Sequence, residues 1–116
     1  MMPIANDDRG NAEEPLLSVI IPAVDEASTL GTTIAAIRSD ALPFEIIVVD
    51  AQSGDDTSAV ANAAGARVIS CSRRQRAQQL NLGARYARGS ILLFIHADTL
   101  LPARGLDHVA EKMHDP

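Results

Sequence analysis

The feature that most constrains the fold is a set of four short apolar runs, rich in β-branched residues, spread along a chain of 116 residues. Continuous runs of this length are typical of strands buried on both faces of a sheet. Pro22 stops the first run and Asp50 ends the second. The predicted strands are residues 17–21 (LSVII), 45–49 (EIIVV), 67–70 (RVIS) and 91–95 (ILLFI).

The segments between these runs show helical periodicity. Ser28 is placed to cap the first helix, and Gly65 is placed to end the second. The predicted helices are residues 29–39, 57–64, a third that follows the arginines at 73–76 and ends near 88, and a fourth that begins at 102. The residues predicted to face inward are Leu30, Ile34 and Ile37 in the first, Ala77, Leu80, Ala84 and Ala87 in the third, and Leu106, Val109, Ala110 and Met113 in the fourth.

Strands that alternate with amphipathic helices predict an α/β fold. A helix between successive strands lets them run parallel, with right-handed connections and helices on both faces, so we expect a mainly parallel, Rossmann-like sheet of about four strands. Residues 1–15 carry charges, Pro and Gly without a period, and predict a mobile tail. Residues 16–116 are then a single domain, as the length suggests.

Composition excludes several classes of protein. Aromatic residues make up 3% of the chain, Trp is absent and the net charge is −5, so a nucleic-acid partner is not expected. Cys71 is the one cysteine, which excludes an internal disulfide. We expect Cys71 to pack as a small apolar side chain at the end of a strand. No run is long enough to span a membrane and the N-terminus lacks a signal-peptide pattern, so we expect a cytoplasmic protein. Membrane contact is not indicated, and a membrane partner is left open.

Charge is distributed unevenly along the chain. Residues 57–97 hold no acid and six arginines, whereas the rest of the chain carries all fifteen acidic residues. A local positive field in an acidic protein favours a small anionic ligand, although a solvated helix face explains the charges equally well.

Acidic side chains follow three of the predicted strands. Asp25 and Glu26 follow the first, Asp50 the second, and Asp98 the fourth together with His96. Because the carboxyl ends of parallel strands share one edge of a sheet, these groups are expected on one rim, close to the arginine cluster. Carboxylates that hold a divalent cation, beside arginines that neutralise phosphates, fit a nucleotide diphosphate. The chain has neither a P-loop motif nor a G-x-G-x-x-G turn.

These segments, taken together, resemble glycosyltransferase family 2, whose fold is of the GT-A type. The resemblance covers about residues 16–104, and within the family it is greatest to the radical-SAM/selenodomain-associated subgroup. The matching segments are LSVIIPAVDE (residues 17–26), EIIVVD with Ser53 and Asp55 (residues 45–55), RAQQLNLGAR (residues 76–85) and ILLFIHAD (residues 91–98).

The resemblance implies roles for individual residues. Pro22, Asp25 and Glu26 match the first nucleotide-contact loop, in which Glu26 reaches the ribose or base. Asp50 matches the acid that recognises a uracil-type base. Asp98 matches the last acid of a D-x-D metal motif, which binds Mn²⁺ or Mg²⁺ on the diphosphate. Further contacts beside the nucleotide and its phosphates are implied for Arg76, Asn81 and Gly83.

Several of these residues have a structural alternative. Asp25 is equally suited to capping the first helix, while Asp55 and Asp56 are expected to cap the second, where carboxylates favour the N-terminus. Arg73 and Arg74 are expected to be solvated, and Asn81 is explained as well by exposure on a helix. His96 stands where the family has the first acid of D-x-D and is the second predicted metal ligand, although packing against the end of the sheet explains it about equally well. Imidazole suits Mn²⁺ better than Mg²⁺.

The resemblance implies an inverting transfer of sugar from a nucleotide-diphosphate donor to an unknown acceptor, yet no residue matches the family's catalytic base. In the family, the base and the acceptor site belong to a later half, so these residues are expected to form the donor-binding part, truncated relative to the family. The alternative is an inactive nucleotide-binding or assembly module, with self-association or a partner covering the apolar sheet edge. A receiver-like domain needs a lysine at the end of a late strand, and is disfavoured because the single lysine, Lys112, lies in the last predicted helix. A phosphatase-like domain is disfavoured because His96 stands where that class needs an acid.

Overall fold

A computed structural model describes residues 15–114 of the chain, and it confirms the predicted α/β architecture. The tail predicted for residues 1–15 lies, apart from Pro15, outside the described residues. The four strands are β1 (Leu17–Ala23), β2 (Phe44–Asp50), β3 (Arg67–Ser70) and β4 (Ile91–Phe94). They form one parallel sheet in the order β3-β2-β1-β4.

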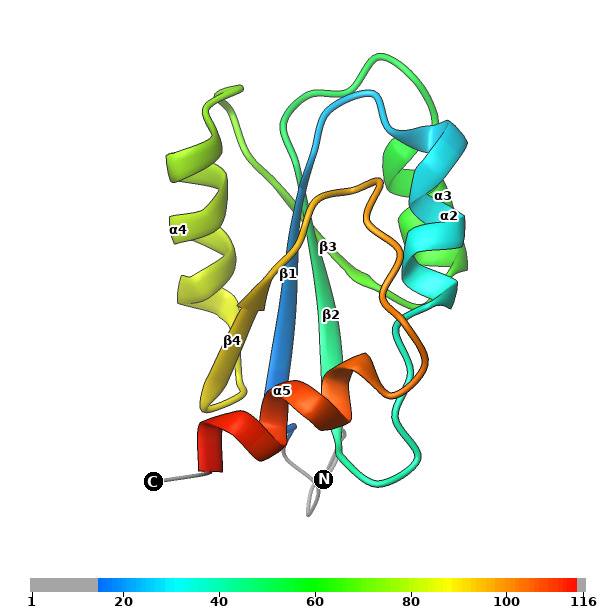
Figure 1. The fold of residues 1–116 in the computed structure, drawn as a ribbon. Helices are drawn as coiled ribbons and strands as arrows, with labels where there is room; N and C mark the ends of the chain where they lie inside the picture. Colours follow the sequence, from blue (N-terminus) through cyan, green and yellow to red (C-terminus); the bar gives the residue numbers. More distant parts are fainter. Residues whose placement is uncertain (1–14, 115–116) are drawn as a thin grey trace, which may run out of the picture.

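Helices cover both faces of this sheet, as Figure 1 shows: α4 stands on one face, and the other three helices stand on the opposite face. The helices are α2 (Ala27–Ala35), α3 (Thr57–Ala63), α4 (Arg76–Tyr86) and α5 (Gly105–His114). None of the helices in the described part is long and apolar enough to cross a membrane.

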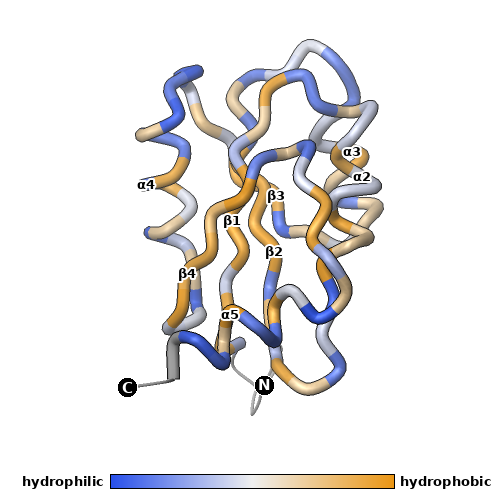
Figure 2. The backbone as a smooth tube through the Cα atoms, in the orientation of Figure 1, coloured by the Kyte–Doolittle hydropathy of each residue, from blue (hydrophilic) through white to orange (hydrophobic). Residues whose placement is uncertain are grey.

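The core follows from the apolar runs, which lie along the strands in Figure 2. All seven residues of β1 are buried because neighbouring strands flank it and helices cover both of its faces. Its Val19 and Ile21 pack with α2 and α5 on one face, whereas Ile20 packs toward α4 on the other. Cys71, just after β3, is 6% exposed in this second cluster, which confirms its prediction as a strand-end apolar residue.

The edge strand β4 is half-buried on one face and exposed on the other. Ile91 and Leu93 pack into the larger cluster, while Leu92 and Phe94 point to the face of α4 and are 39% and 46% exposed. Helix α4 packs on β1 and β2, and so does not cover β4.

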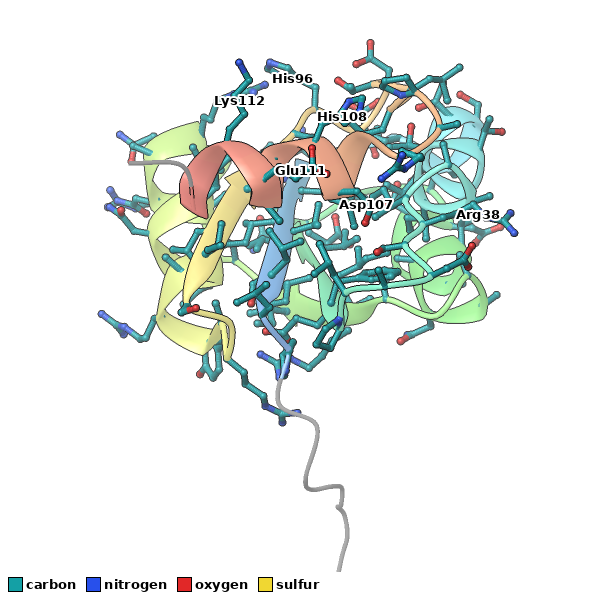
Figure 3. All side chains as sticks on the ribbon, turned by 60° about the horizontal axis from the view of Figure 1, so that its bottom comes forward. Arg38, His96, Asp107, His108, Glu111 and Lys112 are labelled. Carbon is teal, nitrogen blue, oxygen red and sulfur yellow. The ribbon has the colours of Figure 1, made fainter. Side chains whose placement is uncertain are left out.

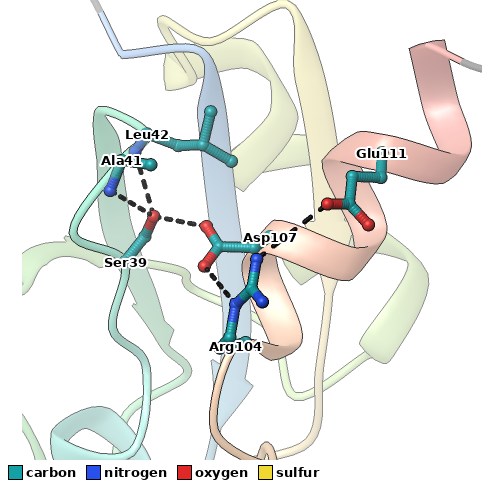
Figure 4. Close-up of polar contacts among 6 residues, drawn as sticks. All are labelled: Ser39, Ala41, Leu42, Arg104, Asp107 and Glu111. Atoms are coloured by element: carbon teal, nitrogen blue, oxygen red, sulfur yellow. Dashed lines mark hydrogen bonds and ion pairs between the residues drawn. The ribbon is translucent and has the colours of Figure 1, made fainter.

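Helix α5 is fixed to the segment after α2 by polar side chains (Figure 4). The Ser39 hydroxyl donates to Asp107 Oδ1 at 2.7 Å, and Arg104 Nε lies 3.5 Å from Asp107 Oδ2. These contacts hold Leu106 and Ala110 against the core, as the periodicity predicted for both residues.

The structure corrects three details of the sequence analysis. Strand β1 continues through Pro22, which is tolerated because it lies beyond the last β1–β4 pair, Ile20 with Phe94, so its missing N–H breaks no bond to β4. Ser28 is not an N-cap: α2 begins at Ala27, whose N–H is taken by Asp55. Ala77 is exposed rather than inward-facing, because α4 turns Gln79 and Gly83 to the sheet.

Candidate functional site

The strand order determines where a ligand site is expected. The chain winds from β1 outward through β2 to β3, and then returns to the other side of β1 to form β4. In open parallel sheets, ligands bind outside the carboxyl ends of the strands where this winding reverses. The candidate site is therefore the rim formed by residues 24–26, after β1, and residues 95–104, after β4; in Figure 1 the segment after β4 (orange) rises beside β1 before it descends to α5.

The loop after β1 is braced by the loop after β2. The Asp25 N–H donates to Ser53 Oγ at 2.8 Å, and Asp25 Oδ1 accepts the Gly54 N–H at 2.6 Å. Asp25 itself has a left-handed backbone (φ 55°), which these two bonds support. Asp25 thus does not cap α2, and its carboxylate holds the rim in shape.

A single carboxylate, that of Asp55, caps two helices at once. It accepts the Ala27 N–H of α2 at 3.2 Å, the Thr57 N–H of α3 at 3.0 Å and the Thr57 hydroxyl. These hydrogen bonds lower the pKa of Asp55, and the bond from the Thr57 hydroxyl has the largest effect. Thr57 Oγ1 also accepts the Glu26 N–H at 2.9 Å, so the backbone of Glu26 is fixed at the rim.

The loop after β4 is anchored through its middle residue. The Ala97 carbonyl accepts the Thr33 hydroxyl of α2 at 2.6 Å, and Ala97 is 4% exposed. Its neighbours His96 and Asp98 are exposed on either side, and Figure 3 shows His96 projecting outward from this loop. The carboxylates of Glu26 and Asp98 make no hydrogen bond or ion pair within residues 15–112, which leaves them able to bind a ligand.

Asp50 lies at the rim but is only 8% exposed. Its Oδ1 accepts both the N–H (3.3 Å) and the hydroxyl of Ser53, and its Oδ2 accepts the Ser58 hydroxyl of α3 at 2.5 Å. A carboxylate offers about four acceptor positions, so these bonds leave about one, on Oδ2. Asp50 therefore supports the loop after β2 and retains little capacity for a further partner.

Two arginines of the cluster reach the rim. Arg76 Nη1, at the start of α4, lies 2.7 Å from His96 Nδ1. Arg74 donates to the carbonyls of Ala51 (3.2 Å) and Gln52 (2.7 Å), and so is not simply solvated as the sequence predicted. The structure thus brings Arg76, His96, Glu26 and Asp98 to the same edge.

The side chains at this edge could hold a metal ion only if a bound ligand supplied further coordinating oxygens. Among the described residues, no three His, Cys, Asp or Glu side chains lie close enough together to hold an ion. Asp98 offers a hard carboxylate of the kind that Mg²⁺ and Mn²⁺ share with bound phosphates. The residues therefore fit a cation that is held jointly by the protein and a diphosphate, and do not fit a cation held by protein side chains alone.

Three of the predicted nucleotide contacts do not join this group of exposed side chains. Pro22 is buried within β1. Gly83 lies beneath α4, where an added Cβ would come within 2.5 Å of Ile20 Cγ2, so close packing explains this glycine. Asn81 lines a separate hollow of about 420 Å³ beside the end of β3, together with Cys71 and Arg85.

Sequence reasoning missed Gln79, which is 4% exposed beneath α4. Its Nε2 donates to the carbonyls of Ala23 (3.3 Å) and Val49 (3.0 Å), and so ties α4 to the ends of β1 and β2. Gln79 and Gly83 are four residues apart and therefore lie on the same face of α4, which was the available signal. Neither residue is strongly apolar, however, so hydrophobic periodicity does not identify this face as the buried one.

Comparison with known proteins places the chain in a family. The model of "Glycosyl transferase family 2" matches residues 18–116. The chain belongs to glycosyltransferase family 2. Among curated members, glucosyl-3-phosphoglycerate synthase of Mycolicibacterium paratuberculosis is 38% identical over 96 residues, which cover 74% of this chain and 29% of that protein. The chain thus spans less than a third of the length of this relative.

Solved structures of the family share the fold. The mannosyltransferase PcManGT of Pyrobaculum calidifontis, solved with GDP-Man and Mn²⁺, is 30% identical with a TM-score of 0.77, over 89% of this chain and 33% of that one. Glucosyl-3-phosphoglycerate synthase of Mycobacterium tuberculosis, solved with Mn²⁺, UDP and glucosyl-3-phosphoglycerate, is 30% identical with a TM-score of 0.71, over 85% and 39%. These neighbours confirm a GT-A-like fold.

Proposed function

We propose that this chain binds a nucleotide-diphosphate sugar together with a divalent cation, and that it is the donor-binding part of an inverting glycosyltransferase. The observation that carries the proposal is the gathering of Glu26, Asp98 and the Arg76–His96 pair on the rim where the strand order reverses. A diphosphate with its cation needs both signs of charge at one edge, and this edge supplies both. Relatives solved with Mn²⁺ and UDP or GDP-Man support the choice of ligand.

The residues take separate roles in this proposal. Asp98 would hold Mn²⁺ or Mg²⁺ on the diphosphate, and Arg76 would neutralise a phosphate oxygen. Glu26, on its fixed backbone, would reach the ribose or the base. Asp50 would contact the base through its remaining acceptor position, while Asp25 sets the shape of the loop. Contacts of Pro22, Asn81 and Gly83 with the nucleotide stay predictions.

The chemistry of inverting transfer requires a base that removes the proton of the acceptor hydroxyl as it attacks the anomeric carbon. No residue of the described part is assigned to that task, and the acceptor is not identified. The cation, when bound, supplies charge stabilisation for the leaving diphosphate. The side chains on this rim bind and orient the donor.

Calorimetry tests the proposal directly. The chain is titrated with UDP and with GDP, each in Mn²⁺, in Mg²⁺ and in EDTA. We expect one nucleotide to bind in the presence of a cation and to bind at least about tenfold more weakly to Asp98→Ala. Asp56→Ala, which removes an exposed acid near the rim, is the matched control. Equal affinity of Asp98→Ala would remove the metal assignment, and no binding of either nucleotide under any condition would overturn the proposal.

Two finer assignments accompany the proposal. We place the chain with the radical-SAM/selenodomain-associated subgroup, on the four segments that resemble the family (residues 17–26, 45–55, 76–85 and 91–98). We also expect a cytoplasmic location, which a fluorescent fusion would test: an envelope signal would contradict it.

The exposed face of β4 favours the second candidate, an inactive assembly module. Leu92 and Phe94 lie beside a strand edge that no other described strand covers, and such an edge promotes pairing with another chain. Light scattering on the protein and on the Phe94→Ser variant measures self-association. A monomer would count against this candidate, and so would hydrolysis or transfer of a nucleotide sugar.

A further inference from the structure

The contact between Arg76 and His96 joins two segments of the rim that are twenty residues apart in sequence. Arg76 Nη1 lies 2.7 Å from His96 Nδ1, and both side chains are exposed. Arg76 is the first residue of α4, and His96 precedes Ala97, whose carbonyl is held by Thr33. Both ends of the contact thus rest on fixed backbone.

The geometry determines which partner accepts the hydrogen bond in this contact. A guanidinium has N–H donors and no acceptor, so His96 Nδ1 must accept. A neutral imidazole that accepts at Nδ1 carries its proton on Nε2. Neither ring nitrogen then has a lone pair for a metal ion. The predicted role of His96 as a metal ligand and the observed contact with Arg76 are mutually exclusive.

The contact also determines what Arg76 can do. It uses one N–H of the guanidinium and leaves the other donors of the planar fork for an anion. Within residues 15–112, no carboxylate forms an ion pair with Arg76, so none of these residues neutralises its positive charge. An exposed contact of this kind adds little to the stability of the fold.

We propose that His96 is a positioning residue: it holds the Arg76 guanidinium at the rim for the diphosphate of the donor, and Asp98 alone of the two predicted ligands binds the cation. This inference rests on the proposed function, because it assigns the division of labour within that same site. Pre-ordering a long side chain lowers the entropy that must be lost when the ligand binds.

A double-mutant cycle tests this assignment with the affinity for UDP as the readout, or for GDP where that is the nucleotide that binds, both in EDTA and in Mn²⁺. We expect His96→Ala to weaken UDP binding by about three- to tenfold in both conditions, the range expected for losing one pre-ordered side chain. The double variant His96→Ala/Arg76→Ala should bind no more weakly than Arg76→Ala alone. His96→Asn keeps an acceptor for Arg76 and should restore part of the affinity. Arg73→Ala, which removes an exposed arginine of the same cluster, measures the effect of charge alone.

Three results would overturn the inference. The first is a His96→Ala effect that is confined to Mn²⁺, and the second is an effect that adds fully to that of Arg76→Ala. The third is a nitrogen coupling from imidazole in the electron spin-echo spectrum of the Mn²⁺–UDP complex that is lost in His96→Ala. If the wild-type chain binds neither UDP nor GDP under any condition, the proposed function fails together with the inference. If it binds while the cycle is additive, the inference alone fails.

Discussion

The two ends of the sheet use polar side chains differently. At the amino end, Glu45 is 14% exposed and its carboxylate accepts the Ser18 hydroxyl at 2.6 Å and the Arg88 N–H at 2.7 Å, with Arg67 Nη1 at 3.6 Å. At the carboxyl end, the carboxylates of Glu26 and Asp98 have no such partners among residues 15–112. Polar groups that satisfy one another stabilise the fold, whereas polar groups left at a braced rim are available to a ligand.

Substitution of Glu45 should remove the polar contacts at the amino end of the sheet and cause the largest loss of unfolding free energy. Glu45→Ala leaves the Ser18 hydroxyl and the Arg88 N–H without their acceptor and Arg67 without its ion-pair partner, and should cost about 3 kcal/mol of unfolding free energy. Urea denaturation measures the loss. Glu45→Gln keeps one carbonyl acceptor and should cost about 1 kcal/mol. A change below about 0.5 kcal/mol in Glu45→Ala, the size typical of surface substitutions, would contradict this account of the amino end.

Asp50 tests the intermediate case, an acid that lies at the rim but is engaged by the protein. Asp50→Asn replaces one acceptor oxygen by an amide donor beside Ser53 and Ser58, and should lower the unfolding free energy by about 1–2 kcal/mol. Ser58→Ala removes a single bond and should cost less. If Asp50→Asn unfolds like the wild type while UDP affinity falls, Asp50 belongs with the ligand-facing acids instead.

Asp98 should show the opposite behaviour to Glu45. Asp98→Asn should leave the unfolding free energy within about 0.5 kcal/mol of the wild type, because its side chain is exposed. The enhancement of UDP affinity by Mn²⁺ should fall about tenfold or more. The matched measurement is UDP affinity of folded Glu45→Gln, expected to be unchanged. Loss of stability in Asp98→Asn of the size seen in Glu45→Ala would remove the distinction between the two ends.

The smallest expected effect is the pH dependence of the rim through Asp55. Its hydrogen bonds lower its pKa below the usual value of 3.8, so it binds a proton more weakly in the folded state. The stability that it contributes is therefore present above pH 3.8 and is lost as the pH falls through the lower, folded-state pKa. Urea denaturation between pH 5 and pH 2.5 should show a steeper loss for the wild type than for Asp55→Asn. Asp56→Asn, an exposed neighbour, should keep the steep wild-type loss; equal slopes for wild type and Asp55→Asn would contradict the capping role.

The strands and their parallel arrangement were predictable because their signal is local. A continuous run such as residues 45–49 reports burial on both faces directly, and the alternation of strands with helices implies right-handed crossovers. The convergence of Glu26, Asp50 and Asp98 on one rim followed from the same logic, since parallel strands share their carboxyl edge. The helix boundaries were less accurate: α2 begins at Ala27 because Asp55 supplies the cap from a distant loop, which no local pattern records.

The amino-acid sequence by itself determined the α/β class, the parallel sheet and the edge at which the acidic residues meet, because hydrophobic periodicity and chain direction are properties of neighbouring residues. Only the tertiary structure decided which of those acids are engaged by the protein and which face outward. Asp25, Asp50 and Asp55 accept hydrogen bonds within the rim, while Asp98 does not, and Arg76 meets His96. Those pairings join residues far apart in the chain, and they depend on how the loops pack against one another.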